Sequence, residues 1–210
     1  MRACVRYRRF GMGLVGIALV SAAATGDAQS ERDQTVQVMK QSFQARGQAG
    51  LDRLDQDEAQ AACSRRPSDG SIPVDTAERI AKAAVASVKL PPDGRLMGDW
   101  REGEKIAQSG VGMQWSDDPK RPAGGNCYAC HELSPAELSF GTIGPSLRGF
   151  GKTRGAGPDM QRYVYTKIYD PTAFVSCSVM PRFGQKHILT EGQIVHLVAL
   201  LLDPASPVNR

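Results

Sequence analysis

The chain has 210 residues, enough for one ordinary domain and an extension, and 41% of them are hydrophobic. Its 26 Lys and Arg side chains exceed its 22 Asp and Glu side chains, giving a formal net charge of +4 at pH 7. Residues 1–28 hold four of the arginines and one aspartate, so the remainder carries 22 basic and 21 acidic side chains. A remainder so close to neutrality, without a clustered basic stripe, gives no electrostatic case for binding nucleic acid.

The N-terminal segment has the pattern of a secretory signal. Arginines precede an apolar run from Gly11 to Ala24 that is too short to span a bilayer comfortably. Small residues favour cleavage after Ala28, with a cut after Ala24 as the alternative. Adjacent Arg8 and Arg9 leave the twin-arginine export route open beside the general one. A retained membrane anchor is the competing interpretation, but the pattern favours a cleaved signal and a periplasmic protein.

The rest of the chain divides by composition at Leu90-Pro91-Pro92-Asp93-Gly94, a turn cluster that a helix cannot cross. We therefore expect an extension over residues 29–98 and a second domain over residues 99–210. No further long apolar segment indicates a membrane span.

Three segments of the extension predict helices. Residues 35–46 are rich in Gln, Val, Met and Lys, and residues 51–63 are rich in Ala and Asp. Residues 75–89 place apolar side chains at helical spacing, and Asp75 with Glu78 is the expected cap of that helix.

The second domain also predicts helices. Asp99 begins one that runs to about Gln108, with Ile106 and Ala107 on its buried face. Residues 110–125 predict a loop because they are rich in Gly, Pro and Asp. Residues 162–169 have the length of a helix.

The clearest helix signal lies near the C-terminus. Thr190-Glu191-Gly192-Gln193 reads as a capping box, apolar residues follow at helical spacing as far as Leu202, and Pro204 ends the pattern. Strand signals are scarce, so the predicted fold class is all-α.

The run Cys127-Tyr128-Ala129-Cys130-His131 predicts one covalently bound haem c. Two cysteines at this spacing place both thiols on one turn, where they form thioethers with the haem vinyl groups, and the histidine that follows ligates the iron. A zinc site would need a second pair of ligands, and a thioredoxin-like dithiol would need an α/β setting. The sequence supplies neither context.

The second axial ligand is expected to be Met180. It lies 49 residues after His131, in a loop constrained by Pro181 just before the last predicted helix. His187 is the next candidate. The other candidates are the remaining methionines and histidine after the signal: Met39, Met97, Met113, Met160 and His196. Low-spin His/Met ligation fills both axial positions and favours electron transfer over oxygen activation.

Other residues have two interpretations each. The turn that begins Gly144-Pro145 places a carbonyl near Pro145 that is expected to accept the His131 Nδ1 hydrogen bond and so to tune the iron. Arg182 and three tyrosines are candidates for contacts to the haem edge or propionates: Tyr163, Tyr165 and Tyr169. The alternative, at least as strongly favoured, is aromatic packing for the tyrosines and a solvated position for Arg182. His196 is expected to be structural.

Four cysteines follow the signal, and the haem accounts for two of them. In an oxidising compartment free thiols are unusual, so Cys63 and Cys177 are expected to form a disulfide that ties the extension to the Met180 loop. A buried free thiol and intermolecular pairing are the alternatives.

Residues 103–209 resemble class I cytochromes c: a short first helix, the haem motif, a Gly-Pro-x-Leu turn, a methionine loop and a closing helix. More narrowly, the ordered set of motifs around Cys127, Pro145 and Met180 and the C-terminal run from Leu200 to Asn209 look like the SoxX family. These proteins are the small subunits of the SoxAX cytochromes of thiosulfate oxidation.

This resemblance implies a class I cytochrome c fold with a helical N-terminal extension, in a periplasmic heterodimer with a SoxA-type subunit. That complex couples thiosulfate oxidatively to a cysteine of the SoxYZ carrier, an L-cysteine S-thiosulfotransferase reaction. By the resemblance, this chain holds no catalytic residue. It accepts electrons and passes them to a small cytochrome c, with the haem bound by Cys127, Cys130, His131 and Met180. The extension would cover the SoxA interface.

Two alternatives stay open. One is an independent electron-shuttle cytochrome c or a haem subunit of another periplasmic oxidoreductase; the long extension and near-neutral charge favour the complex over a free shuttle. The other is a haem enzyme such as a peroxidase, which would need an open iron site.

Overall fold

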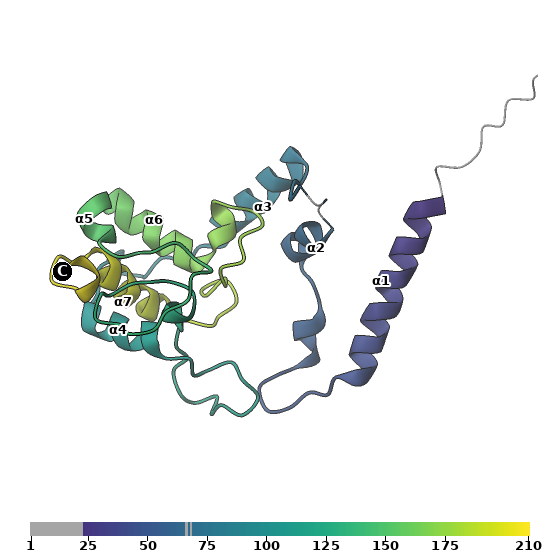
Figure 1. Cartoon of the computed structure of the whole chain (residues 1–210), viewed down its shortest axis with the longest axis horizontal. Helices are drawn as coiled ribbons and strands as arrows, with labels where there is room; N and C mark the ends of the chain where they lie inside the picture. The colour runs from purple at the N-terminus through teal and green to yellow at the C-terminus, as the bar shows by residue number, and fades with distance from the viewer. Residues whose placement is uncertain (1–22, 66, 68) are drawn as a thin grey trace, which may run out of the picture. The chain divides into compact units, whose positions relative to one another are not determined.

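The computed structural model describes residues 23–65, 67 and 69–210. All of its named elements are helices, which are joined by loops (Figure 1). Its α-helices are α1 (Ala23–Ser42), α2 (Glu58–Ser64), α3 (Val74–Ser87), α4 (Trp100–Gln108), α5 (Phe150–Arg154), α6 (Pro158–Tyr169) and α7 (Glu191–Leu202). Short 3-10 turns are η1 (Leu51–Leu54), η2 (Cys127–Ala129), η3 (Pro171–Ala173) and η4 (Pro207–Asn209). No β-strand forms within these described ranges, so the all-α prediction is confirmed.

The chain forms two compact units, residues 1–43 and residues 44–210. In the first unit, most side chains of α1 from residue 31 onward are exposed. The predicted signal lies partly in residues 1–22, outside the described residues. None of the helices in the described part of the chain is long and apolar enough to cross a membrane.

In the second unit, α7 supplies the centre of the core. Its capping box is present: Thr190 Oγ1 accepts from the Gln193 N–H at 3.2 Å, and Gln193 Oε1 accepts from the Thr190 N–H at 3.1 Å. Seven of its residues are buried, from Ile194 to Leu202. Figure 1 shows α7 between α4 and α6, both of which it contacts.

The packing of α4 on α7 depends on a glycine. A side chain at Gly103 would strike the His196 carbonyl oxygen and approach Leu200 Cβ at 2.9 Å, so only glycine allows this closeness. Asp99 caps α4 by accepting from the Arg101 N–H at 2.8 Å, as predicted, and Ala107 is fully buried. The Asp99 N–H donates to His196 Nδ1 at 2.9 Å, which gives His196 a structural role.

Helix α6 buries two of the three tyrosines that were candidates for haem contacts. Tyr165 and Tyr169 stack with ring centroids 6.1 Å apart, and the Tyr165 hydroxyl donates to the Lys89 carbonyl at 2.7 Å. Tyr163 lies near the surface, 4.8 Å from the Phe174 ring. Core packing is therefore the interpretation that the structure supports for Tyr165 and Tyr169.

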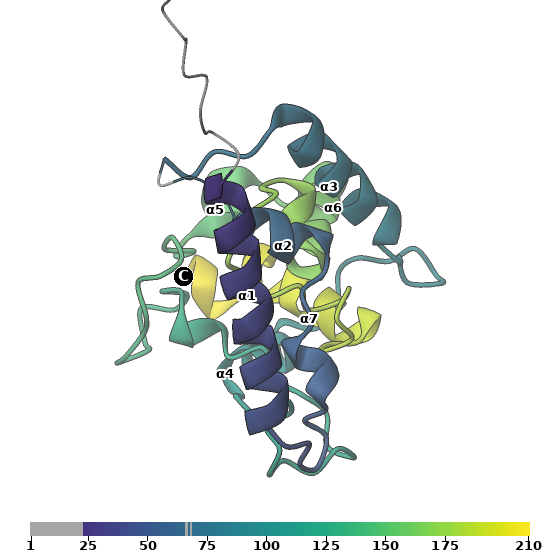
Figure 2. The same ribbon diagram turned by 90° about the vertical axis from the view of Figure 1, so that its right-hand side faces the viewer.

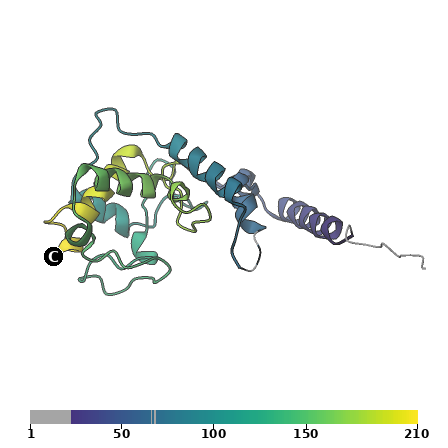
Figure 3. The ribbon, with the colours of Figure 1, turned by 90° about the horizontal axis from the view of Figure 1, so that it is seen from above.

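The extension departs from the prediction in its helix bounds. The predicted helix over residues 35–46 ends earlier, at Ser42, and the one over residues 51–63 is divided into η1 and α2 because Asp57 caps a new helix there. Helix α3 follows Pro73 without a side-chain cap, so the predicted cap by Asp75 is wrong. The turn at Gly94 is present, with φ of 71°. Helix α3 contacts η3. It lies near α6 in Figure 2 and to one side of the green and yellow helices in Figure 3.

Replacing Gly103 by Ala is expected to destabilise the protein by about 1–3 kcal/mol, although alanine favours helix, because the new methyl group collides with α7. Gly192→Ala is the matched control: Gly192 also lies in a helix, but nothing lies within 4 Å of its added Cβ. That variant is expected to gain about 0.5 kcal/mol. Urea unfolding of both variants checks this, and equal effects would contradict the close α4 to α7 contact.

Candidate functional site

The turn from Cys127 to His131 contains two thiols and an imidazole within five residues. Asn126 enters it in the left-handed region with φ of 46°. The N–H groups of Cys130 and His131 then donate to the Cys127 carbonyl at 3.1 and 2.9 Å. Both cysteines are half-buried free thiols, and burial raises the pKa of Cys127 to about 12. At neutral pH the Cys127 sulfur is therefore a neutral thiol.

The ends of α4 and α7 position this turn. The Gly125 N–H donates to the Ile106 carbonyl at 2.8 Å, and the Asn126 N–H donates to Ser109 at 2.9 Å, just after α4. From the start of α7, Gln193 Nε2 donates to the Ala123 carbonyl at 2.7 Å. The turn is thus held by the C-terminal end of α4 and the N-terminal end of α7.

The His131 ring has a defined tautomer. Its Nδ1 lies 2.7 Å from the Pro145 carbonyl oxygen, which can only accept, so Nδ1 is the donor; in the neutral imidazole the lone pair is then on Nε2. The hydrogen bond expected from the sequence is present. Gly144 packs on the same ring so closely that a side chain there would overlap it, and the Gly144 N–H donates to the Cys130 carbonyl at 2.8 Å.

Sequence reasoning missed a carboxyl beside this turn. The Tyr128 hydroxyl donates to Glu104 Oε1 at 3.0 Å, and Gln108 Nε2 donates to the same oxygen at 2.8 Å. Burial raises the pKa of Glu104, and its Oε2 is buried without a hydrogen-bond partner among the described residues. No sequence signal marks Glu104, because its only local partner is an ordinary i, i+4 glutamine.

Within residues 23–65, 67 and 69–210, no three His, Cys, Asp or Glu side chains gather as ligands for a metal ion.

The candidate axial ligand Met180 lies in a segment without regular structure, residues 176–187, here called the Met180 loop. Met180 is half-buried and packs against the core, and its N–H donates to Ser178 Oγ at 3.3 Å. Further along, the N–H groups of Gly184 and Gln185 both donate to the Tyr169 carbonyl at 3.1 Å. The loop is thereby fixed to the end of α6.

The other candidate ligands divide by exposure. Met97 and Met160 are partly buried against the core, whereas Met39 and Met113 are exposed. His187 is exposed and adopts the left-handed φ of 54°.

The extension is fastened to the Met180 loop by the expected disulfide. Cys63, in the last turn of α2, is bonded to Cys177, with a Cα to Cα distance of 5.5 Å. The free-thiol and intermolecular alternatives are therefore excluded for this fold. Next to the disulfide, Ser176 Oγ donates to the Ala77 carbonyl of α3 at 3.0 Å.

An ion-pair cluster makes a second connection. Asp57 Oδ2 lies 2.6 Å from Arg182 Nη2 and 2.9 Å from Lys186 Nζ, and only 13% of the Arg182 side chain is exposed. Burial alone would raise the pKa of Asp57. Hydrogen bonds from Lys186, the Gln60 N–H and Arg182 outweigh it and lower that pKa from 3.8 to about 2. Arg182, a candidate haem contact, is thus paired with the extension.

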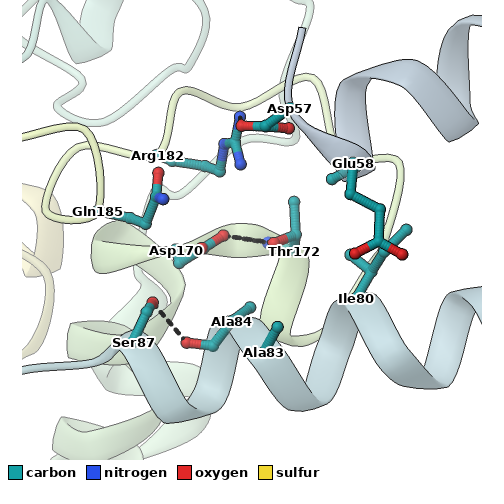
Figure 4. Close-up of a pocket in the computed structure, with 11 residues that line it drawn as sticks. Asp57, Glu58, Ile80, Ala83, Ala84, Ser87, Asp170, Thr172, Arg182 and Gln185 are labelled. Atoms are coloured by element: carbon teal, nitrogen blue, oxygen red, sulfur yellow. Dashed lines mark hydrogen bonds and ion pairs between the residues drawn. The ribbon is translucent and has the colours of Figure 1, made fainter.

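A cavity of about 150 Å³ lies beside this cluster, between α2, α3 and η3 (Figure 4). Alanines of α2 and α3 form one side, and Asp170, Arg182 and Gln185 supply polar groups. Asp170 is satisfied by Thr172, while Gln185 Oε1 has no partner among the described residues. Sequence reasoning gave no indication of this cavity, because its walls come from two parts of the sequence, residues 57–87 and residues 170–185, that lie far apart along the chain.

Comparison with known proteins gives one informative relative. No protein-family model matches the chain. An uncharacterized lipoprotein of Aquifex aeolicus (strain VF5) is 42% identical over 158 residues, which cover 74% of this chain and 73% of that protein.

Between about pH 4 and about pH 2, the protein is expected to lose the stabilisation that the Asp57 ion pairs provide. The carboxylate has a lowered pKa in the folded state, so protonation costs stability only below the unfolded value. After allowance for partial solvent exposure, the loss is about 1–2 kcal/mol. Asp57→Asn keeps a residue that caps the helix. Urea unfolding at several pH values should therefore show it less stable than the wild type at neutral pH, with a difference that shrinks as the pH falls below about 4 and disappears only below about pH 2. Parallel curves at every pH would contradict this.

Proposed function

We propose that this chain, which belongs to the same family as the A. aeolicus lipoprotein, is an electron-transferring c-type cytochrome with one covalently attached haem. The observation that carries this proposal is the geometry of one turn: two unpaired thiols, separated by two residues, followed by a histidine whose Nδ1 is already bonded to a carbonyl. The other two cysteines of the described chain form a disulfide, so these two thiols remain available.

The residues present fit the proposed group. Cys127 and Cys130 would hold it through thioethers, and the hydrogen bond to Pro145 orients His131 so that Nε2 is the free ligand atom. Met180 would offer its sulfur as the second ligand, from a loop fixed on several sides. When bound with His/Met ligation, the haem supplies reversible one-electron transfer.

Several features support a class I cytochrome c fold as part of this proposal. A short helix precedes the attachment turn, a Gly-Pro turn packs on the histidine, and a methionine loop leads into a closing helix. The first and last of these helices, α4 and α7, pack directly on each other.

We further propose that the protein works outside the cytoplasm, in the periplasm. The signal pattern of residues 1–28 and the disulfide between Cys63 and Cys177 both suit an exported protein. The relative's name, lipoprotein, is in keeping with export. Lipid attachment is not proposed for this chain, because the first cysteine after the apolar run is Cys63.

The finer proposal is the SoxX role: a small subunit that accepts electrons beside a SoxA-type cytochrome while thiosulfate is joined to SoxYZ, and that passes them to a small cytochrome c. It rests on the resemblance of the ordered motifs around Cys127, Pro145 and Met180. The described extension, fixed to the domain by a disulfide and ion pairs, also favours a subunit of a complex over a free shuttle.

Met180→Ala is expected to keep the covalent haem but to lose the sixth ligand. The protein should remain haem-stained on a denaturing gel, its reduction potential should fall, and it should lose the weak red absorption band of methionine-ligated ferric haem. Met160→Ala is the control, because Met160 also packs partly buried against the core. A Met180→Ala spectrum and potential like those of the wild type would exclude Met180 as the ligand. A wild type without covalent haem would refute the cytochrome proposal.

The SoxX role predicts that the tagged mature protein co-purifies with a second haem-bearing cytochrome from its native periplasm. Its recovery alone, loaded with haem, would favour an independent shuttle. The partner's identity, read by mass spectrometry, separates a SoxA-type subunit from a subunit of another oxidoreductase.

A further inference from the structure

Helix α2 is attached to the Met180 loop on both sides of the methionine. Cys63 is bonded to Cys177, three residues before Met180, and Asp57 pairs with Arg182, two residues after it. Both attachments come from one element, because Asp57 is the N-cap of α2 and Cys63 lies in its last turn.

The two attachment points lie closer together along α2 than the fully extended length of the loop segment that joins them. Asp57 and Cys63 are six residues apart, a rise of about 9 Å along a helix. The five residue steps from Cys177 to Arg182 can extend to about 17 Å. Met180 therefore lies in a short segment of chain that is attached to α2 at both of its ends.

Helix α2 is itself held in place. Asp57 and Gln60 form a capping box, and Glu58 Oε1 lies 2.6 Å from Arg79 Nε of α3, which buries Ile80 and Ala84. The Ser176 hydroxyl bonds to the same helix. The Met180 loop is thus attached to a supported structure, whereas the Met180 N–H bonds only within its own loop, to Ser178.

We propose that α2 is a brace for the Met180 loop, in which Asp57 and Cys63 are positioning residues that keep the Met180 sulfur on the haem iron. This inference rests on the proposed function. Fixing both ends of the segment that contains Met180 reduces the conformations that the loop gains when the sulfur leaves the iron, so the brace lowers the population of this open state. Neither residue contacts the iron.

The central test compares two charge-removing substitutions on adjacent residues of α2. Asp57→Asn removes both ion pairs to the Met180 loop but keeps a residue that caps the helix well. Glu58→Gln removes an equally short ion pair that stays within the extension, to Arg79. The two variants have the same net charge. They differ in the partner that is lost, which lies in the Met180 loop for Asp57→Asn and in α3 for Glu58→Gln.

Added imidazole reports the open state, because its apparent dissociation constant is inversely proportional to the fraction of molecules with Met180 off the iron. Asp57→Asn is expected to bind imidazole about 10-fold more tightly than the wild type, since two charge-assisted hydrogen bonds are lost. Glu58→Gln should bind it as the wild type does, and Asp57→Glu should restore most of the wild-type value. On heating, the red band of Asp57→Asn should disappear well before the far-ultraviolet helix signal does.

The disulfide is tested with Cys63→Ala/Cys177→Ala, which should also bind imidazole more tightly if the protein folds. Hydrogen exchange provides a readout that does not depend on haem: the amides of residues 177–187 should exchange faster in Asp57→Asn than in Glu58→Gln. Equal imidazole affinity and equal exchange in those two variants would overturn the brace while leaving the cytochrome intact. A wild type without haem, or without the methionine band, would overturn the proposed function or its Met180 ligand first.

Discussion

Gly103 lies against the His196 carbonyl, and this contact brings the backbones of α4 and α7 close together. The Asp99 N–H bonds to the His196 ring one turn earlier, so the start of α4 has a fixed position on α7. The chain that leaves α4 donates back to Ile106 and Ser109 as it enters the Cys127 turn, and the start of α7 holds the same stretch through Gln193. The position of the Cys127 turn therefore depends on this one helix pair.

Elements defined by neighbouring residues could be predicted from the sequence. The capping box of Thr190 with Gln193, the cap at Asp99 and the turn at Cys127 all depend on residues within a few positions of one another. The hydrogen bond from His131 to Pro145 spans only 14 positions, and a compact turn makes it nearly local. The disulfide was predictable for another reason, because counting the cysteines left two without a role.

Features that depend on distant pairs could not be predicted. Asp57 lies among several acidic residues of the extension, and nothing in its surroundings distinguishes it as the partner of Arg182, 125 positions away. The division of residues 51–63 into η1 and α2 follows from that same residue, because a carboxylate that caps a helix competes with a continuous helix. The orphaned oxygens of Glu104 and Gln185 likewise result from tertiary burial, which composition and periodicity do not report.

The bond between Cys63 and Cys177 closes a ring of chain with a sequence separation of 114, and Cys127 and Cys130 lie inside that ring. Loop-closure entropy alone favours the wrong bond from Cys63 to Cys127 over the native one by about 0.5 kcal/mol, because the intervening chain is shorter. If the chain is exported N-terminus first, Cys177 is also the last of the four thiols to arrive. Correct maturation in an oxidising compartment therefore depends on timing: the paired thiols of the turn must be protected or consumed before Cys63 reacts with them.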